Sequence, residues 1–112
     1  MESITRFDGE FRFLSNFYPE EIFFRNRTFK TSEAAYQSAK SLDVEEIMAI
    51  QFAKTPGKAK QLGRQVKSLA PGWADNRIQI METILTIKFS NPKLAQQLIS
   101  THPKQLVEGN SW

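Results

Sequence analysis

The sequence predicts an α+β domain in which a small N-terminal antiparallel sheet is packed by about five helices. Short stretches of the first thirty residues alternate aromatic and polar side chains, the period of a half-buried strand. After residue 31 the apolar residues recur at helical spacing, between cap and proline signals. Because the strands precede the helices and do not alternate with them, α+β is favoured over a doubly wound α/β sheet.

The N-terminal segment is predicted to form short strands joined by turns. Residues 11–13 read Phe-Arg-Phe, and this alternation predicts a strand. Asp8-Gly9 predicts a hairpin turn just before it, and Asn26 predicts a second turn.

Two helices are expected next. A Thr-Ser pair can cap a helix over residues 33–42, with Glu33 in the first turn, where the helix dipole favours an anion. Asp43 and Glu46 have the spacing of a capping box and predict a second helix to about residue 54.

Three more helices are expected from the same kinds of signal. The one with the clearest apolar period starts at Asp75 or Asn76, after a loop at Pro71-Gly72. The other two begin at cap and proline pairs, Thr55-Pro56 and Asn91-Pro92, and the last ends at His102-Pro103.

Composition limits the chemistry. With 112 residues, 40% of them hydrophobic, we expect one domain over residues 1–112 with a single core. The chain has no cysteine, which excludes disulfides, thiolate metal sites and a cysteine nucleophile. His102 has no companion histidine, which favours a structural or surface role, and we expect neither a metal nor a cofactor.

The expected location is the cytoplasm, without contact to a membrane, because the sequence has no long apolar run and no signal-peptide core. The net charge of +3 favours an anionic partner, such as a phosphorylated small molecule or nucleic acid, although ordinary solubility explains it equally well. The sequence gives no indication of the oligomeric state.

Three polar side chains share one stripe of the first predicted helix. Glu33, Gln37 and Lys40 are four and three residues apart, with Tyr36 beside them. A carboxylate, an amide and an ammonium group on one stripe could line a pocket for a sugar and its phosphate. A solvated helix face would have the same spacing, so both interpretations stay open.

Other candidates lie further along the chain. Lys60 and Arg64 form a basic stripe that suits either phosphate recognition or a solvated surface. Trp73, predicted in a loop, could stack on a base or fill the core beneath the loop. Near the end, Glu108 and its neighbours could face a site or belong to a frayed terminus.

Five segments in this order resemble the YbiA-like (NADAR) family. The most specific is TSEAAYQSAK at 31–40, which is similar to the family's TSEHxxQxxK helix. The others are FLSNF at 13–17, AKQLGR at 59–64, the W-x₃-R-x₃-M pattern of Trp73, Arg77 and Met81, and LVEGNSW at 106–112.

The resemblance implies an N-glycosidase that hydrolyses a ribose–nitrogen bond. The implied substrates are a phosphoribosylamino-pyrimidine of riboflavin synthesis or an ADP-ribosyl-guanine, free or in ADP-ribosylated nucleic acid. The implied catalytic residues are Glu33, Lys40 and Glu108. The implied substrate-binding residues are Asn16, Tyr36, Gln37, Arg64, Trp73, Arg77, Asn110 and Trp112.

Two departures from the family pattern keep other functions open. Ala34 stands where the family has histidine, and the family's Asp-x-x-Trp-Gly segment and last helix do not follow Trp112. We therefore expect a C-terminally shortened domain. A non-catalytic ADP-ribose or nucleotide-binding module is the alternative, and a helical interaction protein is a third class.

Overall fold

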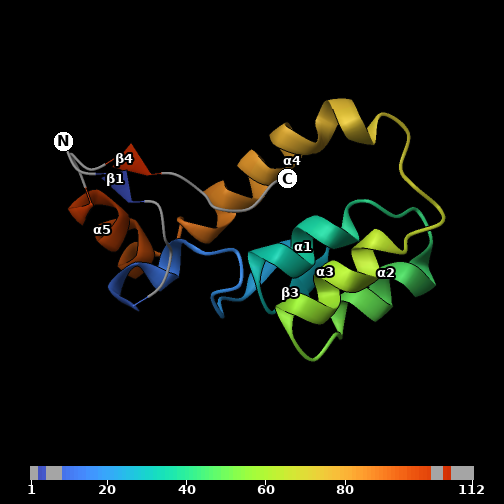
Figure 1. Cartoon of the computed structure of the whole chain (residues 1–112), viewed down its shortest axis with the longest axis horizontal. Coiled ribbons are helices and arrows are strands. Elements are labelled where there is room, and N and C mark those ends of the chain that lie inside the picture. The colour runs from blue at the N-terminus through green and yellow to red at the C-terminus, as the bar shows by residue number, and fades with distance from the viewer. Residues whose placement is uncertain (1–2, 5–8, 102–104, 107–112) are drawn as a thin grey trace.

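The structure, a computed structural model, describes residues 3–4, 9–101 and 105–106 (Figure 1). These residues form five α-helices, one 3₁₀ helix and four short strands, which confirms the α+β class. In chain order the elements are β1 (Ser3–Ile4), η1 (Gly9–Leu14), β2 (Ile22–Phe24), β3 (Arg27–Phe29), α1 (Ser32–Ser38), α2 (Val44–Gln51), α3 (Pro56–Arg64), α4 (Trp73–Lys88), α5 (Pro92–Ser100) and β4 (Gln105–Leu106).

The antiparallel sheet is the hairpin of β2 and β3, with Ile22 opposite Phe29. Arg25 and Asn26 form its turn, and both have positive φ, at 53° and 64°. Two left-handed residues give a turn whose twist matches the flanking strands, so the turn predicted at Asn26 is confirmed. The second sheet pairs β1 with β4 in parallel, which joins segments from near the two ends of the chain.

The strand predicted at residues 11–13 is wrong, because these residues belong to the 3₁₀ helix η1. Phe13 and Leu14 are buried there against Leu94 of α5. A three-residue alternation fits one turn of 3₁₀ helix as well as a strand, and packing on α5 decides between them. Gly9 begins this helix and is no hairpin turn, while Asp8 lies outside the described residues.

Helix α1 lies between α3 and α4, and every one of its residues is buried (Figure 1). Thr31 caps it as predicted, since its side chain accepts a hydrogen bond from the Ala34 N–H. The helix ends at Ser38, earlier than predicted. The chain from Lys40 onward instead bonds to residues 68–70, through Ala70 N–H to Lys40 O at 2.7 Å and an antiparallel bridge.

Helix α4 begins at Trp73, two or three residues before the start predicted at Asp75 or Asn76. Its N-cap is Gly72, which has φ of +72° and no side-chain cap bond. The start of α4 is therefore set by the left-handed backbone of Gly72, a conformation that glycine adopts readily. No side-chain cap marks this start in the sequence. Trp73 accordingly lies on a helix and is not part of a loop. The predicted starts of α3 and α5 are confirmed, with Thr55 and Asn91 as N-caps.

The main core lies where the β2–β3 hairpin, α1 and α4 meet. Its fully buried side chains include Ile22, Phe29, Met81 and Ile84. Across the described residues, no helix is both long and apolar enough to cross a membrane. The compartment stays a prediction.

Asp43 caps α2 as predicted, but Glu46 does not close a capping box. Its carboxylate accepts hydrogen bonds from the Lys67 N–H at 2.8 Å, the Ser68 N–H at 3.3 Å and the Ser41 hydroxyl at 2.6 Å. Glu46 thus ties α2 to the segment that leads toward α4.

These bonds predict a pH dependence of stability. The Lys67 N–H, followed by the Ser41 hydroxyl, lowers the pKa of the Glu46 carboxyl below its ordinary value. The stabilisation is therefore present above the unfolded-state pKa of about 4.3 and is lost as pH falls through the lower folded-state pKa. We expect Glu46→Gln to melt with less pH dependence than wild type in that acidic window. Identical slopes of melting temperature against pH, measured by circular dichroism, would contradict this.

Candidate functional site

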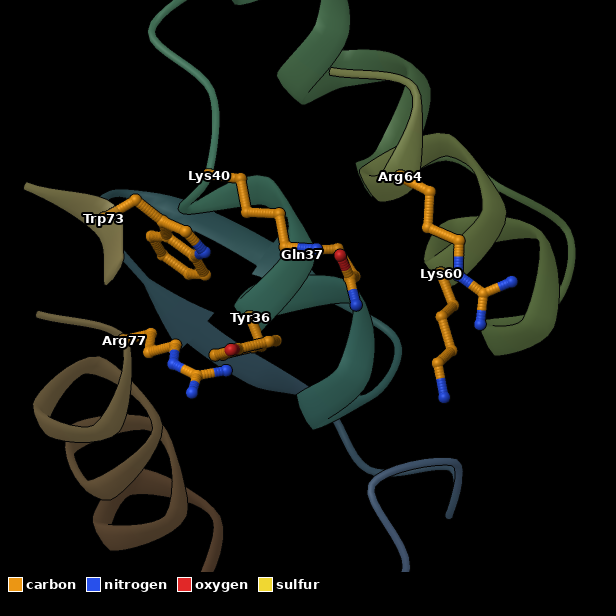
Figure 2. A pocket seen from close by; sticks show the side chains of 7 residues that line it. All are labelled: Tyr36, Gln37, Lys40, Lys60, Arg64, Trp73 and Arg77. Atoms are coloured by element: carbon orange, nitrogen blue, oxygen red, sulfur yellow. The ribbon is translucent and has the colours of Figure 1, made fainter. Parts of the chain in front are cut away.

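Three helices surround a cavity of about 270 Å³ (Figure 2). Tyr36 and Gln37 reach it from α1, and Lys40 from the turn that follows α1. The remaining lining residues come from α3 and α4: Lys60, Arg64, Trp73 and Arg77. The cavity thus brings together five of the sequence-predicted substrate-binding residues and Lys40.

Glu33 and Gln37 of the polar stripe are buried, so the interpretation as a solvated face is wrong for these two, while Lys40 follows the end of α1 and is partly exposed. Glu33 and Gln37 are each only 3% exposed. The Gln37 side-chain amide donates a hydrogen bond from Nε2 to Glu33 Oε2 at 2.6 Å. Because Gln37 lines the cavity, the Glu33 carboxylate lies one hydrogen bond behind its wall.

Asn16 supports the first turn of α1 and is not among the residues that line the cavity. Its backbone oxygen accepts a hydrogen bond from the Glu33 N–H at 3.0 Å, and its Oδ1 accepts one from the Ser32 hydroxyl at 3.1 Å. Its side-chain Nδ2 is buried and has no partner in the described part of the chain. The structure therefore places Asn16 beside Glu33, and its role in substrate binding stays a prediction.

Four cationic side chains face the cavity: Lys40, Lys60, Arg64 and Arg77. Burial lowers the pKa of the Lys40 ammonium group below its ordinary value, and the charges of Arg64 and Lys60 lower it further. Glu33 opposes this shift. An anion in the cavity would relieve the repulsion among these cations, so the electrostatics favour a phosphate group.

Tyr36 and Trp73 form an aromatic wall beside Arg77 of α4, across the cavity from Lys60 and Arg64 of α3 (Figure 2). Their ring centroids are 5.2 Å apart and the planes are inclined by 53°. Trp73 both lines the cavity and packs against the main core, and its stacking on a base stays a prediction. Burial is the main cause that raises the pKa of the Tyr36 hydroxyl, so this group stays a neutral hydrogen-bond donor.

The three C-terminal candidates, Glu108, Asn110 and Trp112, lie outside the described residues. Lys60 lines the cavity beside Arg64, although the family resemblance does not include it among the substrate-binding residues. The sequence signal for Lys60 is its position one turn before Arg64 on the same helix.

Among the described residues no three His, Asp or Glu side chains gather as metal ligands would, and the absence of a metal stays a prediction.

Known proteins are similar to this chain in sequence and in fold. A family model of the NADAR domain matches residues 5–111. The proteins called N-glycosidase YbiA from Escherichia coli (strain K12) and Shigella sonnei (strain Ss046) are each 33% identical over 96 residues, which cover 84% of this chain and 60% of the relative.

The chain therefore spans about 60% of the length of these curated relatives. The NMR structure of the Escherichia coli protein YbiA superposes with a TM-score of 0.82 and 29% identity, covering 96% of this chain and 68% of that one. The resemblance read from the five segments is confirmed, and the chain belongs to the NADAR domain family.

Proposed function

We propose that this domain is an N-glycosidase that hydrolyses the bond between a ribose and a nitrogen. The observation that carries the proposal is a buried carboxylate, Glu33, held by Gln37 immediately behind a cavity rich in cations. The curated relatives are named N-glycosidase, which supports the same reaction class.

Glycosyl hydrolysis needs a carboxylate close to the anomeric carbon. As the C1′–N bond breaks, its electron pair leaves with the nitrogen, and positive charge develops on C1′ and the ring oxygen. In the proposed reaction, Glu33 stabilises this charge and accepts a proton from the attacking water, whose oxygen bonds to C1′. The departing nitrogen takes up a proton from the Lys40 ammonium group, which lines the cavity. Transfer of the Glu33 proton to Lys40 then restores both groups.

The cavity also suggests how a substrate lies. Lys60 and Arg64 would hold a phosphate, because an ammonium and a guanidinium group donate several charge-assisted hydrogen bonds to its oxygens. Tyr36 and Trp73 would contact the base, and Arg77 lies next to Tyr36 (Figure 2).

The size of the cavity bears on the choice of substrate. Its volume of about 270 Å³ is near the lower end of the range usual for ligand pockets. Such a cavity suits one ribose phosphate with part of its base better than a whole dinucleotide. We therefore propose a phosphoribosylamino-pyrimidine ahead of an ADP-ribosyl-guanine.

The direct test is base release, followed by chromatography, from a phosphoribosylamino-pyrimidine, ADP-ribosylated guanosine and NAD. We expect release of the pyrimidine together with a free ribose phosphate, and a lower rate on the two substrates that carry a diphosphate. Faster release from ADP-ribosylated guanosine would keep the reaction and correct the substrate. Tight ADP-ribose binding with no release from any of the three would instead support the non-catalytic binding module.

A further inference from the structure

Gly63 of α3 packs directly against the side chain of Gln37. A Cβ atom at position 63 would overlap the Gln37 amide: it would lie 2.6 Å from Cδ and 3.0 Å from Cβ of Gln37, with Oε1 nearest of all. Real Cβ atoms are essentially never closer than 3.0 Å to such neighbours. The side chain of Gln37 therefore occupies the space that any residue other than glycine would need.

This contact leaves the Gln37 amide very little freedom. On one side its Nε2 is bonded to Glu33 Oε2, and on the other side its Oε1 is buried against α3 with no hydrogen-bond partner in the described part of the chain. The side chain is 3% exposed, so the space left for it is the cavity that it lines, on the side away from α3. A methyl group at position 63 would have to push the amide away from Glu33.

The glycine is needed for space and not for backbone conformation. Positive φ among the glycines is found only at Gly72 in the described residues, and Gly63 lies inside a regular helix. Glycine weakens a helix relative to alanine, so position 63 is unfavourable for α3 taken alone. Ala59, one turn earlier, is also buried, and the two small residues let α3 approach α1 closely.

We propose that Gly63 is a positioning residue for the reacting carboxylate: by lacking a side chain, it lets Gln37 hold Glu33 in place beside the cavity. The proposal rests on the proposed function, because it takes Glu33 as the group that acts on the substrate. Misplacement of a reacting group by about 1 Å can cost up to about 10²-fold in rate. A displaced orienting amide should cost less, about tenfold.

The first experiment compares Gly63→Ala with Gly57→Ala, another glycine-to-alanine change in the same helix. A Cβ at position 57 meets nothing closer than Thr55 Oγ1 at 3.9 Å. We expect Gly63→Ala to lower kcat about tenfold with little change in KM, since the cations that hold the phosphate stay in place. Gly57→Ala should keep wild-type kcat and gain thermal stability. Equal kcat for Gly63→Ala and wild type would overturn the proposal.

A double variant separates a specific push on Gln37 from general damage to α3. Gln37→Ala removes the side chain with which the new methyl group would collide. In that background Gly63→Ala should cost less than about twofold in kcat, because the effects of contacting residues are not additive. A further loss of about tenfold in kcat in that background would show that the methyl group at position 63 lowers kcat without acting on Gln37. That result would overturn the proposal.

A third readout does not depend on turnover. The ¹⁵N side-chain amide resonance of Gln37, identified by its loss in Gln37→Ala, should move in Gly63→Ala and stay unchanged in Gly57→Ala. An unmoved resonance in Gly63→Ala would overturn the proposal whatever the activity. A moved resonance in a protein whose wild type releases no base would support the positioning of Gln37 by Gly63 and overturn the proposed function.

Discussion

Replacement of Glu33 by glutamine is expected to slow base release by at least about 100-fold while the fold is retained. The carboxylate is 3% exposed and is the acidic group bonded to the cavity-lining Gln37. Glutamine has nearly the same shape, and its side-chain oxygen can still accept the Gln37 hydrogen bond. It cannot accept a proton from water or oppose the positive charge that develops at C1′. The measurement is kcat on the preferred substrate, with thermal melting of both proteins.

Glu45→Gln is the matched control, because Glu45 is an exposed carboxylate on α2 and the change removes the same charge. We expect this variant to release base at the wild-type rate. A wild-type rate in Glu33→Gln would exclude Glu33 as the reacting carboxylate and would move attention to Glu108. If Glu33→Gln has no melting transition, its slow base release results from unfolding and does not test the role of Glu33. Glu33→Asp, which keeps the charge, would then test the position of the carboxylate.

The grouping of Glu33, Gln37 and Lys40 could be predicted from the sequence because it depends on helical spacing alone. Their burial could not, since it depends on α3 and α4 covering α1, and both helices lie more than fifteen residues away in the chain. The same long-range packing joins Lys60 and Arg64 to Trp73 and Arg77 around one cavity. Helical spacing predicts which residues share a face of each helix. Only the resemblance to a family indicated that residues from different helices belong to one site.

Local signals failed where the decisive interaction lay elsewhere in the chain. Residues 11–13 alternate like a strand, but contact with α5 supports a 3₁₀ helix. Glu46 has the spacing of a capping box, yet it bonds to backbone groups about twenty residues later. The true start of α4 depends on the left-handed backbone of Gly72 and not on a side-chain cap. By contrast, Thr31, Thr55 and Asn91 cap their helices as predicted, because a cap bond spans only two or three residues.

Replacement of Arg64 by glutamine is expected to raise KM about 10- to 100-fold with kcat little changed. A hydrogen bond to a charged group contributes about 1.5–3 kcal/mol, and each 1.4 kcal/mol is a factor of about ten. The phosphate does not change charge as the C1′–N bond breaks, so Arg64 would bind the ground state and the transition state equally. The measurement is the dependence of base release on substrate concentration for wild type and variant.

Lys58→Gln is the control for Arg64→Gln, because it removes one positive charge from the exposed surface of the same helix. If the whole positive field of α3 attracted the substrate, both variants would raise KM to a similar extent, and added salt would reduce the difference from wild type. A direct contact predicts a large effect for Arg64 alone, because Arg64 lines the cavity and Lys58 does not. A fall in kcat with unchanged KM would place Arg64 at the reacting bond and move the phosphate to another of the cations that line the cavity.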